Sequence, residues 1–148
     1  MSKVEGDWFS VATASDDMGW IQENGDLRLF VRSIEHLSNG SLRFNFRFKV
    51  QRQCVTVDVV CMKTRQNGAF SIAYKGENTV TILETDYNQQ ITLHMQNIRN
   101  GTKTQVLALY GRYPYLESSF LDKFKAICKK YGLSSKNIIE MTRLDDCF

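Results

Sequence analysis

The chain has 148 residues, a length typical of one domain with a single closed core. Hydrophobic residues make up 43% and charged residues 24%, which excludes the composition of a disordered chain. The formal net charge is only +3, and the basic residues are scattered rather than gathered in a stripe, so nucleic acid is not an expected partner. We therefore expect one folded domain over residues 1–148.

Membrane and targeting signals bear on where the protein acts. No stretch approaches the roughly 20 consecutive apolar residues that span a bilayer, so we expect no stable membrane insertion. The opening residues 1–5 lack the apolar segment of a signal peptide. We expect either a cytosolic protein or a secreted protein whose leader was replaced by Met1. Two N-x-[ST] sequons, at Asn39 and Asn100, lie on expected turns and are candidate N-glycosylation sites.

The four cysteines are Cys54, Cys61, Cys128 and Cys147. They form no C-x-x-C pair and have no histidine at zinc-ligand spacing, so we expect no metal site. Their even number is compatible with disulfide bonds.

Turn dipeptides interrupt the sequence at short intervals. Asn39-Gly40, Asn67-Gly68 and Asn100-Gly101 each separate two β-prone runs, and Asn-Gly favours a hairpin because both residues tolerate positive φ. Further turns are expected at 75–78 and 86–88. The pattern predicts eight strands at roughly residues 7–14, 26–37, 41–50, 54–63, 69–75, 79–84, 90–97 and 103–112.

Most of these runs alternate between apolar and polar residues. In the third run, Phe44 and Phe46 alternate with Asn45 and Arg47, a pattern typical of antiparallel strands with one face toward water. A sequential up-and-down order with one apolar face favours closure into a barrel, because closure removes exposed strand edges. The predicted fold class is all-β with one helix: an eight-stranded antiparallel up-and-down barrel.

The hydrophobic period changes after the single proline. Phe124 and Cys128 fall at helical spacing, which predicts one amphipathic helix over about residues 117–131, packed on the side of the barrel. Gly132 is placed to end this helix. A short extra strand and a tail are expected over residues 137–148.

Three motifs lie in order on this pattern: Gly6-Asp7-Trp8, Thr85-Asp86-Tyr87 and Tyr110-Gly111-Arg112. They resemble the G-x-W element of the first strand of lipocalins, the T-D-Y turn and the last-strand arginine of that family. The resemblance runs the whole length of the chain. It is strongest to the urinary, odorant-binding and salivary-allergen branch, and within it to an epididymal member.

The resemblance implies how the barrel is closed and fastened. Arg112 is expected to stack on Trp8 and plug one end, since a guanidinium over an indole gains on the order of 0.5–2 kcal/mol. The residues alone are equally compatible with an ordinary core tryptophan and a surface arginine. The family's disulfide implies a bond between Cys54 and Cys147. The remaining thiols, Cys61 and Cys128, could pair with each other, but we favour free thiols.

An eight-stranded barrel is either filled by its own side chains or wide enough to hold one small ligand. Such an apolar wall offers few polar contacts, so binding should follow ligand size and hydrophobicity. The resemblance makes the Tyr110 hydroxyl the group that orients the ligand's polar end; the alternative is a core tyrosine satisfied by its neighbours. The resemblance places on the cavity lining Leu27, Leu29, Val31, Phe44, Phe46, Val59, Ile72, Tyr74, Val80, Ile91, Leu93, Met95, Val106, Ala108 and Tyr110.

No catalytic residue and no cofactor are expected. Cys61 has no basic neighbour on its strand face that would lower the pKa of the thiol, as a nucleophile needs. His36 and His94 belong to no recognisable catalytic motif and are expected to be solvated. We therefore expect a binding protein and not an enzyme.

The leading hypothesis is an extracellular carrier of a small hydrophobic ligand, odorant-, pheromone- or lipid-like, acting as a monomer or weak dimer. The alternative is a secreted interaction protein whose loops engage a cell-surface receptor or the sperm surface, with the cavity incidental. Apolar Met18, Trp20 and Ile21 in an open-end loop favour this alternative weakly, although they can also cap the barrel mouth. An intracellular fatty-acid-binding barrel is set aside, because those proteins place a helix pair after the first strand and lack the three motifs.

Overall fold

The computed structural model describes residues 2–22, 30–50, 52–74, 76–113 and 116–142. Three short 3-10 turns are present in these ranges, η1 (Ser2–Val4), η2 (Met18–Trp20) and η3 (Ser135–Asn137), together with one helix, α1 (Ser118–Lys130). The strands of the described ranges are β1 (Gly6–Asp7), β2 (Phe9–Ser15), β3 (Phe30–His36), β4 (Leu42–Val50), β5 (Gln53–Lys63), β6 (Ala69–Ala73), β7 (Glu77–Thr85), β8 (Gln90–Arg99), β9 (Thr102–Gly111) and β10 (Ile138–Glu140).

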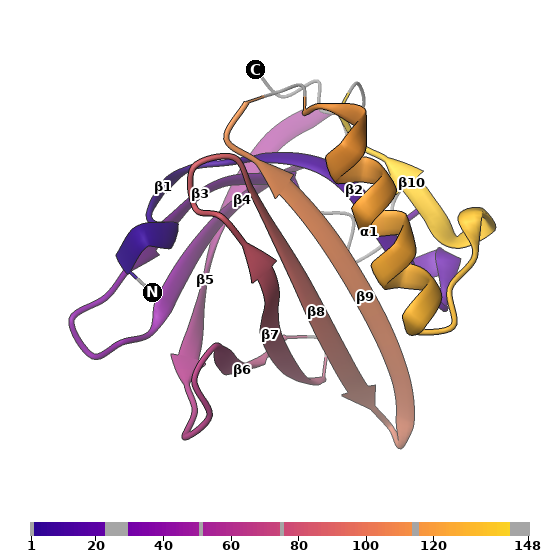
Figure 1. Cartoon of the computed structure of the whole chain (residues 1–148). Helices are drawn as coiled ribbons and strands as arrows, with labels where there is room; N and C mark the ends of the chain where they lie inside the picture. The colour runs from indigo at the N-terminus through magenta and orange to yellow at the C-terminus, as the bar shows by residue number, and fades with distance from the viewer. Residues whose placement is uncertain (1, 23–29, 51, 75, 114–115, 143–148) are drawn as a thin grey trace.

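The strands form one curled antiparallel sheet in the order β1-β3-β4-β5-β6-β7-β8-β9-β2-β10 (Figure 1). Because β1 and β2 are two halves of one extended segment, that segment pairs with both edges and closes the barrel. At the junction, the Trp8 N–H donates to the Arg32 carbonyl (3.0 Å), and the Val31 N–H donates to Ser10 Oγ (2.9 Å). The prediction of an up-and-down barrel with one helix is confirmed.

Some boundaries differ from the prediction. The first predicted strand is divided at Trp8, since the segment changes partner there from β3 to β9. This division adds one strand to the eight predicted for the barrel, and β10 falls in the segment where a short extra strand was expected, so the structure has ten strands. The sixth predicted strand starts earlier, at Glu77, because Gly76 with φ of +116° completes a tight turn in which the Tyr74 N–H donates to its carbonyl.

Helix α1 lies along the outer face of β2 and β9 (Figure 1). Leu107 and Leu109 point outward from β9 and are buried in one cluster with Phe124 and Cys128 of the helix. The expectation of a polar outer face is therefore wrong under α1, because the helix covers this part of the wall and both faces of β9 are buried. No helix among the described residues is long and apolar enough to cross a bilayer.

The helix ends where Gly132 was expected to end it. Gly132 has φ of +80°, its N–H donates to the Lys129 carbonyl (3.1 Å), and the Leu133 N–H donates to the Cys128 carbonyl (3.0 Å). These two bonds are a Schellman motif, which satisfies carbonyls that the last helical turn leaves unpaired. They turn the chain back so that Leu133 is buried beneath the helix.

Candidate functional site

One end of the barrel is closed by a stack of two side chains. The guanidinium carbon of Arg112 lies 3.7 Å from the centre of the Trp8 ring, and Trp8 is almost fully buried. The indole N–H donates to the Val4 carbonyl at 2.7 Å. The Arg112 Nη1 and Nη2 groups donate to the carbonyls of Asp7 (3.0 Å) and Lys3 (3.1 Å). These contacts bind the N-terminal segment to the last barrel strand.

The turn between β7 and β8 supplies a third carbonyl to the same guanidinium. Tyr87 has φ of +60°, and its N–H donates to Thr85 Oγ1 at 2.9 Å. The Asp86 carboxylate accepts from the Gln89 N–H at 2.8 Å. The Tyr87 carbonyl accepts from Arg112 Nε at 2.9 Å. The three sequence motifs thus meet at the closed end, where their polar groups bond to one another.

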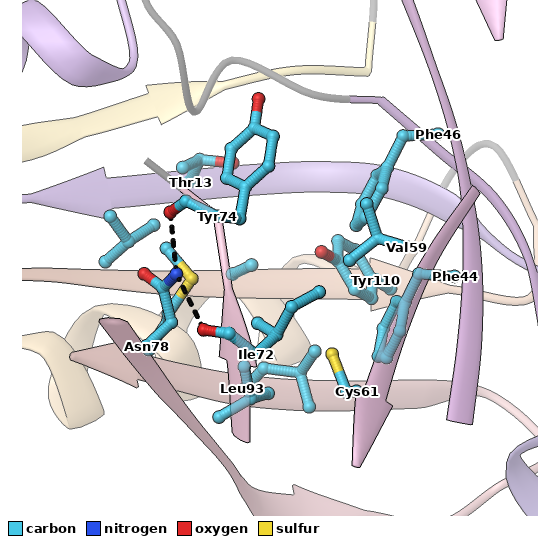
Figure 2. Close-up of a pocket in the computed structure, with 14 residues that line it drawn as sticks. Thr13, Phe44, Phe46, Val59, Cys61, Ile72, Tyr74, Asn78, Leu93 and Tyr110 are labelled. Carbon is cyan, nitrogen blue, oxygen red and sulfur yellow. Dashed lines mark hydrogen bonds between the residues drawn. The ribbon is translucent and has the colours of Figure 1, made fainter. Parts of the chain in front are cut away.

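Beyond this closure, the barrel interior holds a cavity (Figure 2). The space open to the centres of water-sized molecules is about 90 Å³. A single water needs only about 10–15 Å³ in this measure, so the barrel is not filled by its own side chains. The lining residues are Thr13, Phe44, Phe46, Val59, Cys61, Ile72, Tyr74, Asn78, Val80, Leu93, Met95, Val106, Ala108 and Tyr110.

Most of the residues predicted to line the cavity do so. Val31 and Ile91 do not; each is only 1% exposed and packs among the other interior side chains. Leu27 and Leu29 lie outside the described residues. The predicted residues that face the cavity are Phe44, Phe46, Val59, Ile72, Tyr74, Val80, Leu93, Met95, Val106, Ala108 and Tyr110.

Three lining residues were missed: Thr13, Cys61 and Asn78. Alternation along β5 could have found Cys61, because it lies two residues after Val59 and therefore on the same face of the strand. Thr13 and Asn78 carry polar side chains on inward positions, and an apolar pattern gives no signal for them.

Asn78 is polar, but its hydrogen bonds are used within the protein. Its Nδ2 donates to the carbonyls of Tyr74 (2.7 Å) and Ile72 (3.2 Å), both drawn in Figure 2. Its Oδ1 accepts from Asn97 Nδ2 at 2.8 Å. Asn78 therefore holds the connection between β6 and β7 in place and leaves the cavity surface beside it largely apolar.

The hydroxyl of Tyr110 remains available. The side chain is only 6% exposed, and its hydroxyl bonds to no residue in the described ranges. Burial, and to a smaller extent the nearby Cys61, raises the pKa of this phenol, so it stays protonated as a donor. No neighbour among the described residues satisfies this hydroxyl, and its orienting role stays a prediction.

The two thiols at Cys61 and Cys128 are free and lie on opposite sides of the barrel wall. Cys61 belongs to the interior cluster and lines the cavity, whereas Cys128 is buried between α1 and the outer face. Burial raises the pKa of Cys61 to about 12 and that of Cys128 to about 11. Cys147 lies outside the described residues, so its bond to Cys54 stays a prediction.

The histidines are less exposed than expected. The His94 ring stacks on Tyr131 with centroids 4.5 Å apart, and its Nε2 lies 3.2 Å from Gln105 Oε1. The prediction of a solvated His94 was wrong, because the end of α1 covers this position. His36 is half-buried at the end of β3.

The apolar open-end segment folds back onto the barrel. Ile21 is fully buried in a cluster with Val106, and the half-buried Met18 and Trp20 pack against that cluster. Arg99 lies over the Trp20 ring at 5.8 Å. These residues cap the barrel mouth and do not form a free apolar loop.

Comparisons with known proteins agree with this architecture. The model of the lipocalin and cytosolic fatty-acid-binding protein family matches residues 5–145. Mouse epididymal-specific lipocalin-9 is 55% identical over 148 residues, covering the whole of this chain and 83% of that protein. A dog lipocalin allergen superposes with a TM-score of 0.91 at 28% identity, over 98% of this chain and 97% of its own. The possum milk whey lipocalin trichosurin, solved with bound 4-ethylphenol, superposes with a TM-score of 0.90 at 28% identity, over 95% of this chain and 98% of its own.

Proposed function

Because the chain belongs to the lipocalin family, we propose that it is a secreted carrier that binds a small hydrophobic ligand inside its barrel. The observation that carries this proposal is the cavity of about 90 Å³, lined mainly by aliphatic and aromatic side chains. Such a site binds by desolvation and dispersion, with a few polar groups that orient the ligand.

The size and polarity of the cavity suit odorant- or pheromone-like molecules and short lipids with one polar group. Phe44 and Phe46 stack with ring centroids 5.7 Å apart and form a flat aromatic wall. The Tyr110 hydroxyl faces the same space and has no partner among the described residues. The bound 4-ethylphenol of trichosurin supports a ligand of this kind. Tyr110 is therefore the proposed orienting group.

The chemistry of the lining favours transport over catalysis. Its titratable groups with shifted pKa values, Cys61 and Tyr110, are both raised and therefore neutral near pH 7. A general base or nucleophile at neutral pH needs a pKa close to the working pH or a base beside it. The cavity supplies neither, so the proposed role is binding alone.

Secretion is part of the proposal. Similarity to the epididymal-specific lipocalin-9 of mouse supports release into a male reproductive fluid. The sequon residues Asn39 and Asn100 are exposed on turns, where a glycan can be accommodated. The proposed Cys54–Cys147 disulfide fits an oxidising compartment. The alternative role at a receptor or on the sperm surface loses its main support, since Trp20 and Ile21 cap the barrel.

A fluorescent apolar probe tests the carrier function. N-phenyl-1-naphthylamine should gain fluorescence on uptake by micromolar protein, and 4-ethylphenol should displace it. Ala108→Phe fills the cavity and should abolish uptake, whereas Ala73→Phe, the same change at an exposed position of β6, should leave it intact. Absence of uptake by the wild-type protein, or equal uptake by both variants, would contradict internal binding.

A further inference from the structure

Cys61 faces Tyr110 across the cavity. The two residues lie on β5 and β9, which are on opposite sides of the barrel because β6, β7 and β8 separate them one way round and β2, β3 and β4 the other. Figure 2 shows both side chains directed into the same space. Both residues belong to the same buried interior cluster. The cavity thus presents the Tyr110 hydroxyl on the β9 wall and the Cys61 thiol on the β5 wall, in addition to the Thr13 hydroxyl of β2.

Among the residues that the structure describes, neither group has a hydrogen-bond partner. Cys61 is 3% exposed, is free, and makes no hydrogen bond to Tyr110 or to any other described residue. Its thiol keeps its proton at neutral pH, because burial raises the pKa to about 12. A protonated thiol is a weak hydrogen-bond donor and a poor nucleophile, so its role is non-covalent.

Two neutral donors that face each other across an apolar cavity select a particular ligand chemistry. A donor that opens onto a cavity is left without a partner when an apolar ligand covers it, whereas an acceptor placed between the two walls can bond to both donors. A hydrocarbon of the same shape leaves both donors unpaired.

We propose that Cys61 is a second specificity-determining residue, which together with Tyr110 binds the acceptor oxygen of a phenol, alcohol or carbonyl ligand. This inference rests on the proposed carrier function and narrows its ligand class. The cavity then favours oxygenated ligands over hydrocarbons of equal size.

The test compares 4-ethylphenol with 4-ethyltoluene, in which a methyl group replaces the hydroxyl, by displacement of N-phenyl-1-naphthylamine. The measured quantity is the ratio of the two dissociation constants, corrected for the free energy of transfer of each ligand from water to hydrocarbon. Cys61→Ala should lower the preference for the phenol about three-fold and Tyr110→Phe about ten-fold, the range expected for one weak and one ordinary hydrogen bond. Cys61→Ser, with a stronger donor, should restore or exceed the wild-type preference.

Val59→Ala is the matched control on the same face of β5, because it enlarges the cavity without removing a donor. It should change both affinities alike and leave the ratio unaltered. If Cys61→Ala and Cys61→Ser keep the wild-type ratio while Tyr110→Phe changes it, the role of Cys61 is overturned and the carrier function stands. If neither ligand binds the wild-type protein, the carrier function and this inference fail together.

Discussion

Side-chain donors are paired at the closed end of this barrel, whereas two of those in its cavity are unpaired among the described residues. At the closed end, Arg112 donates to three backbone carbonyls and the Trp8 indole to a fourth. In the cavity, Tyr110 and Cys61 have no partner within the described chain. A donor that a ligand covers without bonding to it costs about 1–3 kcal/mol, and a ligand with a suitably placed acceptor avoids this cost. The side chains of the closed end therefore stabilise the fold, whereas those of the cavity are available to a ligand.

The largest expected effect concerns the predicted disulfide, which joins the β4–β5 end of the barrel to the C-terminal tail. Cys54 stands near the start of β5, paired with Lys49 of β4, and its predicted partner Cys147 lies in the tail. Replacing both cysteines by serine should lower the free energy of unfolding by about 4–5 kcal/mol through loop-closure entropy. Urea denaturation measures this loss. Four reactive thiols in the denatured, unreduced wild-type protein would show that the bond does not form.

The next largest effect on stability should come from removing one aromatic side chain from the closed end and one from the cavity. Phe70 is almost fully buried in the cluster that contains Trp8, whereas Phe46 is half-buried and lines the cavity. Phe70→Ala should lower the free energy of unfolding by about 3–5 kcal/mol, as in a close-packed core. Phe46→Ala should cost about half as much, because its side chain already borders empty space. Equal losses in urea denaturation would mean that the cavity half is as tightly packed as the closed end.

A smaller effect should appear at alkaline pH. The Cys61 pKa is about 12 in the folded protein and near 9.0 when the thiol is exposed. Below pH 9 the Cys61 thiol is protonated in both the folded and the unfolded protein, so its contribution to the free energy of unfolding is complete. Between pH 9 and 12 the thiol of the unfolded protein loses its proton first, so the free energy of unfolding falls. At pH 10.5 the expected loss is about 2 kcal/mol. Urea denaturation at pH 8 and 10.5 should show a smaller fall for Cys61→Ser, since it lacks this titration. The same fall in both proteins would contradict a buried, protonated thiol.

The smallest predicted effect tests the fit around Arg112. Gly6 has φ of +113°, and a Cβ there would lie 3.0 Å from Arg112 Nη1. Gly101 has φ of +78° and open space around it, so it shows the cost of a Cβ at positive φ with no neighbouring side chain. Gly101→Ala should cost about 1 kcal/mol and Gly6→Ala about 1 kcal/mol more, measured as the shift in urea midpoint. Equal costs would mean that neither the wider φ at Gly6 nor the contact with the guanidinium adds to the cost of a Cβ.

Local sequence patterns were enough to predict the elements of this fold and the inward face of its strands. Asn-Gly dipeptides favour hairpins because of their backbone conformation, and Gly132 ends α1 for the same reason. Alternation along β4 and β9 correctly placed Phe44, Phe46 and Tyr110 in the interior, since the side-chain period of a strand is two residues.

Depth along the barrel and contacts between distant elements were decided only by the tertiary structure. Val31 and Phe44 both point inward, yet one packs in the closed-end cluster and the other also lines the cavity, because alternation specifies a face and not a height. His94 is covered because α1 ends over β8. Cys61 and Tyr110 line the same cavity because the sheet closes into a barrel, which places β5 and β9 on opposite walls. The sequence by itself determined the strands, their inward faces and the family; the space left among those faces is set by packing between opposite walls, which no local pattern encodes.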